Sequence, residues 1–211
     1  MVGIASVDKL NLQAPVGQRP YDLLPTARSV VVMAVHLING VMDRLPESWR
    51  EFNCNYFEST DFVNALGFKV ARFLERRGCR AYPISYGSRY GIESERLSSR
   101  HAAVEAGLGQ IGLNNLLLTP EYGPRIRLIA VLTEADLMPD KRIEGEICAG
   151  KKCGYRCVDK CPAGALAKSG KINYQKCWDY NKSLPALKIA DSARCGMCMA
   201  ACPRLRSPSK I

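Results

Sequence analysis

The run CAGKKCGYRCVDKCP, residues 148–162, carries four cysteines within fourteen residues and ends in a Cys-Pro pair. A second block, CGMCMAACP at 195–203, repeats that ending with one cysteine fewer, and Cys177 lies between the two blocks. The last 64 residues thus hold eight of the ten cysteines, and a polar stretch with a proline, LMPDKRIEGE at 137–146, precedes them. This asymmetry predicts a larger domain, residues 1–143, followed by a separate C-terminal module, residues 144–211.

The spacing of these cysteines indicates iron–sulfur ligands. C-x4-C-x3-C-x3-C-P is a stretched form of the bacterial ferredoxin pattern C-x2-C-x2-C-x3-C-P, and eight thiolates suffice for two [4Fe-4S] clusters. In two-cluster proteins the cysteine before proline binds the other cluster, so the sequence predicts a crossed assignment. We expect the first cluster on Cys148, Cys153, Cys157 and Cys202, and the second on Cys161, Cys177, Cys195 and Cys198.

Zinc is the main alternative for such a cysteine-rich segment. Zinc sites usually pair two C-x2-4-C knuckles across a gap, whereas here Cys161 and Cys202 each precede proline and the first block is crowded. Disulfides are disfavoured in a compartment that keeps thiols reduced. The two remaining cysteines, Cys54 and Cys79, fit small apolar side chains better than ligands.

Composition places the chain among ordinary soluble proteins, with 47% hydrophobic and 24% charged residues in 211. No apolar run reaches the roughly 18 residues of a membrane-spanning helix, so we expect no membrane partner. The start, MVGIASVDKLN, lacks a basic region followed by an apolar one, and the only Arg-Arg pair, Arg76-Arg77, lies mid-chain. These features predict a cytoplasmic protein without a secretory or twin-arginine signal.

The formal net charge is +10 at pH 7. Two oxidised clusters, each about −2 with its four thiolates, would lower this charge to about +6. A solvated basic surface accounts for the remainder. A nucleic-acid or phosphate-bearing partner is the sharper alternative, although no RNA-binding signature accompanies the charge.

The first 143 residues alternate strand and helix patterns. RSVVVMAVHL at 28–37 indicates a buried strand. A helix is expected from Ser59 or Thr60 to about Arg77, with Gly78 as its stop. Its expected apolar stripe is Phe62, Leu66, Val70 and Phe73.

CRAYPISY, residues 79–86, predicts an edge strand limited by Pro83. A second helix is expected over 98–106, ending at Gly107. NNLLLTP and RIRLIAVLTEA, joined by the turn EYGP, predict an antiparallel hairpin. The predicted fold class is therefore α/β (α+β), a mixed sheet with flanking helices followed by a two-cluster ferredoxin-like module.

Residues 99–137, SRHAAVEAGLGQIGLNNLLLTPEYGPRIRLIAVLTEADL, combine an AGLG-x2-G motif with the cysteine module that follows. Together they resemble the shared core of the tRNA epoxyqueuosine reductases and the corrinoid reductive dehalogenases, in which an isolated cysteine also precedes the last cysteine block. QRPYDLLPTARSVVVMAVHL, residues 18–37, is similar to the first strand region of that family. The resemblance covers nearly the whole chain.

The resemblance implies a nitroreductase-like α/β domain that holds cobalamin without a histidine on cobalt, beside a cluster that supplies electrons. Its polar corrinoid contacts fall on Arg19, Asn114 and Asn115 of this chain. Gly109 and Gly112 would let the backbone approach a bulky macrocycle. On spacing alone, these glycines equally fit the end of a helix and the start of a strand.

In that family the proton donor is an aspartate seven residues before the arginine that corresponds to Arg100, which places Glu93 in this role. The longer glutamate side chain requires a reshaped pocket, and a general acid needs burial to raise its pKa. Solvated loop carboxylates at Glu93 and Glu95 are the alternative. Further candidate donors, since the dehalogenases use a tyrosine, are Tyr56, Tyr86 and Tyr90.

These features predict an iron–sulfur oxidoreductase, a cobalamin-dependent reductase that receives electrons from a low-potential donor such as ferredoxin or flavodoxin. The alternatives are a ferredoxin-like electron carrier without a corrinoid and a flavin-dependent iron–sulfur reductase. The expected substrate is a small molecule or a nucleotide. The chain stops at Ile211, without the helical-repeat extension that many epoxyqueuosine reductases use for tRNA, which weakens tRNA as the expected substrate.

Overall fold

The computed structural model describes residues 1–84, 97–185 and 193–203. The chain forms two compact units, each assembled from separate stretches. The first, here called the sheet unit, comprises Met1–Val35, Ser59–Gly109 and Arg127–Glu144. The second, the cysteine unit, comprises His36–Glu58, Gln110–Ile126 and Gly145–Ile211. The two units interleave in sequence. The division into contiguous domains 1–143 and 144–211 stays a prediction.

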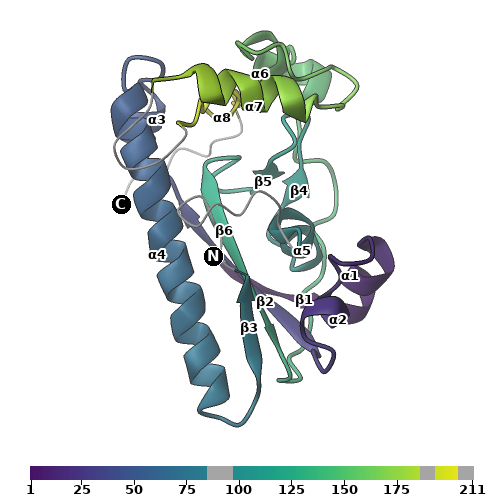
Figure 1. Ribbon diagram of the computed structural model, residues 1–211. Coiled ribbons are helices and arrows are strands. Elements are labelled where there is room, and N and C mark those ends of the chain that lie inside the picture. The colour runs from purple at the N-terminus through teal and green to yellow at the C-terminus, as the bar shows by residue number, and fades with distance from the viewer. Residues whose placement is uncertain (85–96, 186–192, 204–211) are drawn as a thin grey trace. The chain divides into compact units, whose positions relative to one another are not determined.

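The sheet unit contains a four-stranded sheet with the order β1-β2-β6-β3 (Figure 1). Both outer pairs, β1 with β2 and β3 with β6, are antiparallel. The central pair is antiparallel as well, since Arg28 N donates to Thr133 O and Leu37 N donates to Arg125 O. The sheet is therefore antiparallel, not mixed as the sequence predicted. Its strands are β1 (Val2–Ser6), β2 (Ser29–His36), β3 (Ala81–Ile84) and β6 (Ile126–Thr133).

The predicted strand at 28–37 is confirmed as β2, whose first six residues are buried. β3 lies at the sheet edge, as Pro83 indicated, because proline has no N–H to donate and is tolerated where that side of the strand has no neighbour. The predicted hairpin is wrong, since β5 (Leu117–Leu118) pairs with β4 (Gln110–Ile111) and not with β6. Thr119 and Gly123 instead exchange two backbone hydrogen bonds, which close a separate turn before β6.

The longest helix, α4 (Trp49–Glu75), begins well before the predicted start at Ser59. Its predicted stop is confirmed, because Gly78 adopts a left-handed φ of +83° just beyond the last turn. The first part of α4, up to Glu58, belongs to the cysteine unit, and the remainder belongs to the sheet unit.

Within the sheet unit, α4 packs on one face of the sheet. Leu66 and Val70 of the predicted stripe pack against this core, whereas its two phenylalanines do not. Val63, Ala71 and Leu74 are buried against β2 and β6, whereas Phe62 and Phe73 are 62% and 53% exposed. Smaller aliphatic side chains suit this face because helix and sheet approach closely. The closest point is Gly67, where an added Cβ would lie 2.3 Å from Ile129 Cδ1.

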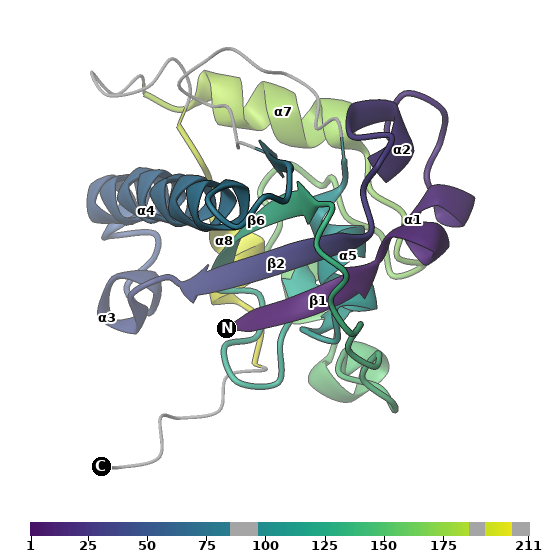
Figure 2. The ribbon, with the colours of Figure 1, turned by 90° about the horizontal axis from the view of Figure 1, so that it is seen from below.

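The opposite face of the sheet carries α1 (Val7–Gln13) and α5 (Ser99–Glu105), which contact β1 (Figures 1 and 2). At Gly3 of β1, an added Cβ would lie 2.2 Å from the carbonyl oxygen of Ala106, so only glycine fits there. The predicted bounds of α5 are confirmed: Ser98 caps its start, and Gly107 follows its end with φ +68°. α2 (Pro20–Leu23) follows α1.

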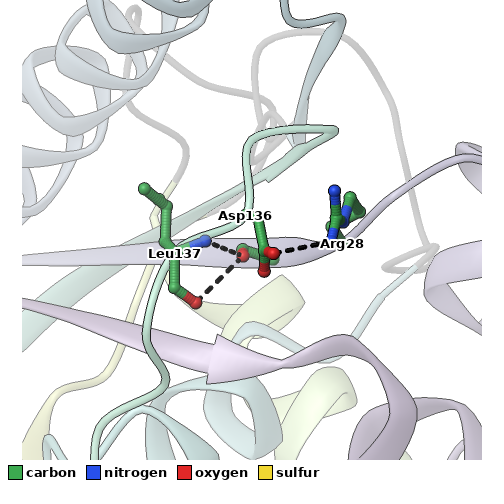
Figure 3. A network of polar contacts seen from close by, with 4 residues as sticks. Arg28, Asp136 and Leu137 are labelled. Carbon is green, nitrogen blue, oxygen red and sulfur yellow. Dashed lines mark hydrogen bonds and ion pairs between the residues drawn. The ribbon is translucent and has the colours of Figure 1, made fainter.

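The segment after β6 is tied to the start of β2 by the polar contacts in Figure 3. Ser29 Oγ accepts a hydrogen bond from Leu137 N at 2.9 Å and donates to Leu137 O at 3.3 Å. Beside it, Arg28 and Asp136 form a 2.6 Å ion pair. Because Ser29 is buried and the ion pair is exposed, the serine contributes more to holding this segment.

The cysteine unit is built from the start of α4, several short helices and the β4–β5 ladder. Its apolar core contains Leu37, Met42, Phe52 and Met199. None of the helices in the described ranges is long and apolar enough to cross a membrane. The short helices are α3 (Asn39–Met42), the 3-10 helix η1 (Gly150–Cys153), α6 (Arg156–Asp159), α7 (Tyr174–Ser183) and α8 (Met197–Ala200).

Candidate metal centre

One pocket of the cysteine unit is lined by the four cysteines that the crossed assignment gives to the first cluster. Cys148, Cys153, Cys157 and Cys202 line it together with Leu113, Asn114 and Leu118. Cys202 comes from the second cysteine block, after α8. Cys161 closes the first block in sequence, yet within the described part of the chain it is not among the residues that line this pocket.

Sharp turns bring the first three of these cysteines together. η1 ends at Cys153, and both Gly154 and Tyr155 then adopt left-handed backbone conformations, with φ +66° and +55°. α6 begins directly afterwards and carries Cys157. Left-handed residues reverse the chain direction over a short distance, so closely spaced cysteines can line one pocket.

The other four cysteines form a second neighbourhood. Burial raises the pKa of Cys195, and repulsion from Cys161 and Cys177 raises it further. Burial also raises the pKa of Cys198, with added repulsion from Cys195, Cys177, Cys161 and, in last place, Cys157. For Cys157, burial is again the main cause, followed by repulsion from Cys202, Cys148 and Cys153. The two neighbourhoods match the crossed assignment, while ligation itself stays a prediction.

Two buried asparagines hold the loop that begins the second cysteine block. Asn53 of α4 accepts a hydrogen bond from Arg194 N at 2.7 Å and donates to Arg194 O at 3.1 Å. Asn181 of α7 accepts from Cys195 N at 2.8 Å and donates to Cys177 O at 2.9 Å. The amide of Asn181 therefore joins two predicted ligands of the second cluster that lie far apart in sequence.

The same loop requires glycine at position 196. Gly196 caps α8 in a left-handed conformation with φ +72°. An added Cβ would lie 2.6 Å from Phe52 Cζ and 3.0 Å from Leu45 Cδ1. Because Phe52 is fully buried, the loop between Cys195 and Cys198 rests directly on the apolar core of the cysteine unit.

Arg194, next to this loop, lies close to two aromatic rings. Its guanidinium carbon is 5.8 Å from the ring centroid of Tyr56 and 5.7 Å from that of Trp178. Trp49 Nε1 donates to Arg194 O at 3.1 Å, so the backbone is fixed as well. The positive charge offsets part of the increase that burial causes in the pKa of Cys177. The site thus places a fixed cation near a predicted cluster ligand.

The glycine-rich motif packs against its own chain. An added Cβ at Gly112 would lie 2.6 Å from Leu118 Cδ1 and 3.0 Å from Asn114 Oδ1. Asn114 is buried and donates to Cys198 O at 3.4 Å. Asn115 has φ +57° and donates to the hydroxyl of Tyr174. Gly112 thus serves internal packing, and both asparagines have partners within the cysteine unit.

The remaining predicted site residues are dispersed or lie outside the described residues. Arg19 belongs to the sheet unit, where its Nε donates to Ala14 O at 3.1 Å. Gly109 is buried in the same unit. Cys54 is exposed on α4, and Cys79 is half-buried. The candidate proton donors Glu93, Tyr86 and Tyr90, with Glu95, lie outside the described residues.

Sequence reasoning missed the side chains that support the cysteines, namely Asn53, Asn181 and Phe52. Asn53 and Trp49 are one helical turn apart, and both bind the backbone of Arg194, which lies too far away in the sequence for a local pattern to indicate it. Asn181 follows Cys177 by one turn of α7 and donates to its carbonyl and, at 3.7 Å, to its sulfur. In both helices the two residues are four positions apart, which places their side chains on the same face.

Comparison with known proteins gives two kinds of relatives, although no family model matches the chain. A tetrachloroethene reductive dehalogenase of Sulfurospirillum multivorans is 36% identical over 191 residues, which cover 84% of this chain and 36% of the relative. An epoxyqueuosine reductase of Bacillus subtilis (strain 168) is 28% identical over 199 residues, which cover 87% of this chain and 49% of the relative. The chain therefore spans half or less of the length of these curated relatives.

The fold agrees with these relatives. A solved reductive dehalogenase, whose mechanism is described as B12-dependent, superposes with a TM-score of 0.70 at 20% identity, covering 99% of this chain and 30% of that one. Solved epoxyqueuosine reductases match as well. The chain therefore belongs to the superfamily that contains the epoxyqueuosine reductases and the reductive dehalogenases.

Proposed function

We propose that the chain is an iron–sulfur reductase with two [4Fe-4S] clusters that deliver electrons to a corrinoid. The observation that carries the proposal is the division of the eight cysteines into two neighbourhoods, with Cys202 in the pocket of Cys148, Cys153 and Cys157. This is the arrangement that the cysteine before proline has in two-cluster ferredoxins. The two cysteine neighbourhoods would together form the ferredoxin-like part of the chain.

The donor set fits a cubane better than a single ion. In the described ranges, no three histidine, cysteine or acidic side chains converge closely enough to hold one metal ion. A cubane is larger than one ion, so its four thiolates stand farther apart around a shared pocket. Four thiols line this pocket, and thiolate is the ligand that iron–sulfur clusters require.

The support for a corrinoid comes from the relatives and from the place of the first cysteine neighbourhood. One solved relative is described as a B12-dependent dehalogenase. Asn114, which the family resemblance assigns to corrinoid contact, lines the pocket with Cys202 and Cys148. A corrinoid bound at this turn would supply reductive chemistry, and the first cluster would be its nearest electron donor. The relatives are named for different substrates, so the proposal extends no further than reduction of the corrinoid.

The proposal is tested by iron, sulfide, zinc and cobalt analysis of protein purified without oxygen. We expect about eight irons and eight sulfides per chain and no stoichiometric zinc. Cys202→Ser should lose one cluster, whereas Cys54→Ser, an exposed cysteine outside both neighbourhoods, should keep both. A stoichiometric zinc content with few irons would contradict the proposal.

The corrinoid is tested separately by adding cobalamin to the reconstituted protein. We expect saturable binding and, after reduction of the clusters, the absorption change of reduced cobalt. If the clusters assemble but cobalamin neither binds nor becomes reduced, the corrinoid part of the proposal is wrong. Electron transfer to a partner protein without any cobalamin would then favour an electron carrier, and a yellow chromophore would favour a flavin enzyme.

A further inference from the structure

The outer face of α7 combines exposed aromatic and basic side chains beside Cys177. Tyr174, Trp178 and Lys182 recur at every fourth residue and therefore lie along one stripe of the helix. Tyr174 is 59% exposed and Trp178 is 37% exposed. Lys182 Nζ lies 5.3 Å from the Trp178 ring centroid. The neighbouring stripe is Cys177 and Asn181, and Asn181 is buried, so the exposed stripe borders a predicted cluster ligand.

This face belongs to a strongly basic segment. Residues 150–185 contain eight lysines and arginines but only two acidic residues, Asp159 and Asp179, which gives a formal charge of 8 − 2 = +6. All eight basic residues are exposed. Water and salt weaken the effect of exposed charges on a cluster inside the unit. Exposed positive charges at these positions instead favour the attraction of an acidic partner from solution. The basic residues are Lys151, Lys152, Arg156, Lys160, Lys168, Lys171, Lys176 and Lys182.

We propose that the α7 face formed by Tyr174, Lys176, Trp178 and Lys182 is the docking surface for an acidic one-electron carrier protein of the flavodoxin type. This inference rests on the proposed function. The reduced carrier would lose one electron, and the cluster held by Cys177 and its three partners would gain it. No bond forms or breaks, and no proton is transferred. The electron would then pass to the first cluster.

The position of the face relative to the two cysteine neighbourhoods supports this direction. Trp178 follows Cys177 directly in α7, so a carrier that covers Trp178 comes close to the second cluster. The first neighbourhood instead shares its pocket with Asn114 and Leu118, on the turn assigned to the corrinoid. Interfaces of electron carriers are small and are guided by opposite charges, which suits one short basic helix.

RNA is the main competing occupant, because exposed aromatic rings among lysines also stack on bases. RNA binding does not require a redox centre directly beneath the surface. Here the helix that presents the aromatic and basic side chains also carries Cys177 and the asparagine that fixes it. A redox partner accounts for both properties of α7 at once.

The test compares charge reversal on α7 with the same charge change elsewhere. Lys176→Glu/Lys182→Glu alters the proposed surface, and Lys69→Glu/Arg76→Glu alters two exposed residues of the sheet unit. The probe is flavodoxin. Its reduced form reports the second-order rate of cluster reduction in stopped flow, and its oxidised form reports affinity by calorimetry.

We expect the α7 pair to lower the rate and the affinity at least tenfold at low ionic strength, with a flatter salt dependence. The control pair should stay within twofold of the unaltered protein. A neutral pair, Lys176→Gln/Lys182→Gln, should lie in between. Equal losses from the α7 pair and the control pair, or no loss from either, would overturn the docking surface.

Two further readouts separate this inference from the proposed function. Iron content and the EPR spectrum after exhaustive dithionite reduction should be the same in all variants, because the altered lysines are exposed. If the unaltered protein contains no iron–sulfur clusters, the proposed function itself is wrong. If the α7 pair loses tenfold affinity for an RNA stem-loop but keeps the flavodoxin rate, the face is an RNA surface and the inference is wrong.

Discussion

Replacing Gly196 with alanine tests how the second cysteine block is supported. The new Cβ would meet two obstacles: a left-handed backbone with φ +72°, and the ring of Phe52 at 2.6 Å. An alanine in the left-handed region costs about 1–2 kcal/mol. Overpacking a buried site costs a further 1–3 kcal/mol, approximately. The expected loss in the free energy of unfolding is therefore about 2–5 kcal/mol.

Gly154→Ala is the matched control for this substitution. Gly154 also follows a predicted cluster ligand and has φ +66°, but no atom lies within 4 Å of its Cβ position. It should lose only the backbone part, about 1–2 kcal/mol. Urea unfolding without oxygen, on samples of equal iron content, measures the difference as a midpoint gap of roughly 1 M.

A second control isolates the contact with Phe52. In a Gly196→Ala/Phe52→Leu double variant the smaller side chain leaves room for the new methyl group. The loss in the free energy of unfolding should therefore be smaller in the double variant than the sum of the losses in the two single variants. Equal midpoints for Gly196→Ala and Gly154→Ala, or strict additivity with Phe52→Leu, would refute the reasoning that the loop rests on this ring.

Three other changes test separate parts of the molecule. Val63→Ala should cost about 2 kcal/mol, whereas Phe62→Ala should stay within about 0.5 kcal/mol because Phe62 is exposed; thermal unfolding that reverses this order would contradict the observed face of α4. Asn53→Ala removes both hydrogen bonds to the Arg194 backbone and should cost about 2–4 kcal/mol, with loss of iron from the second cluster; unchanged iron and stability would argue against this support. In cluster-free protein the pKa of Cys198 is raised above its ordinary 9.0, so folding protects the neutral thiol. The free energy of unfolding should fall above pH 9, and this thiol contributes up to about 1.4 kcal/mol per pH unit to the fall; a rise in stability over this range would contradict the burial of the thiol.

The cysteine grouping was predictable because it depends on a local rule. In two-cluster proteins the cysteine before proline binds the other cluster, and the crossed sets follow from that rule at Cys161 and Cys202. β2, Gly78 and the Ser98–Gly107 helix were equally local signals: an apolar run, a left-handed stop and a capping residue.

The start of α4 was not predictable in this way. Asn53 and Asn55 interrupt the apolar pattern between Trp49 and Ser59, and polar residues at such positions normally indicate the helix exterior. In the structure both are buried, and Asn53 binds the backbone of Arg194, more than 140 residues away in sequence. A partner at that distance leaves no trace in the local pattern.

The two ends of the predicted α4 stripe and the β5 pairing were wrong for related reasons. Stripes that contain Phe62 or Val63 have the same period, and the close approach of Gly67 to Ile129 favours the smaller side chains. The residues of β5 show the pattern of a strand, but this pattern does not indicate which strand pairs with it. That partner is set by the turn at Gly112, whose amide donates to Leu116 O.

Iron analysis of two double cysteine variants tests the central claim, the crossed assignment, most directly. Cys148→Ser/Cys202→Ser changes two ligands of one predicted cluster, so about four of eight irons should remain. Cys148→Ser/Cys161→Ser changes one ligand in each cluster, and both clusters should be lost. If the second variant keeps about four irons and the first keeps almost none, the cysteines bind in sequence order and the crossed assignment is wrong.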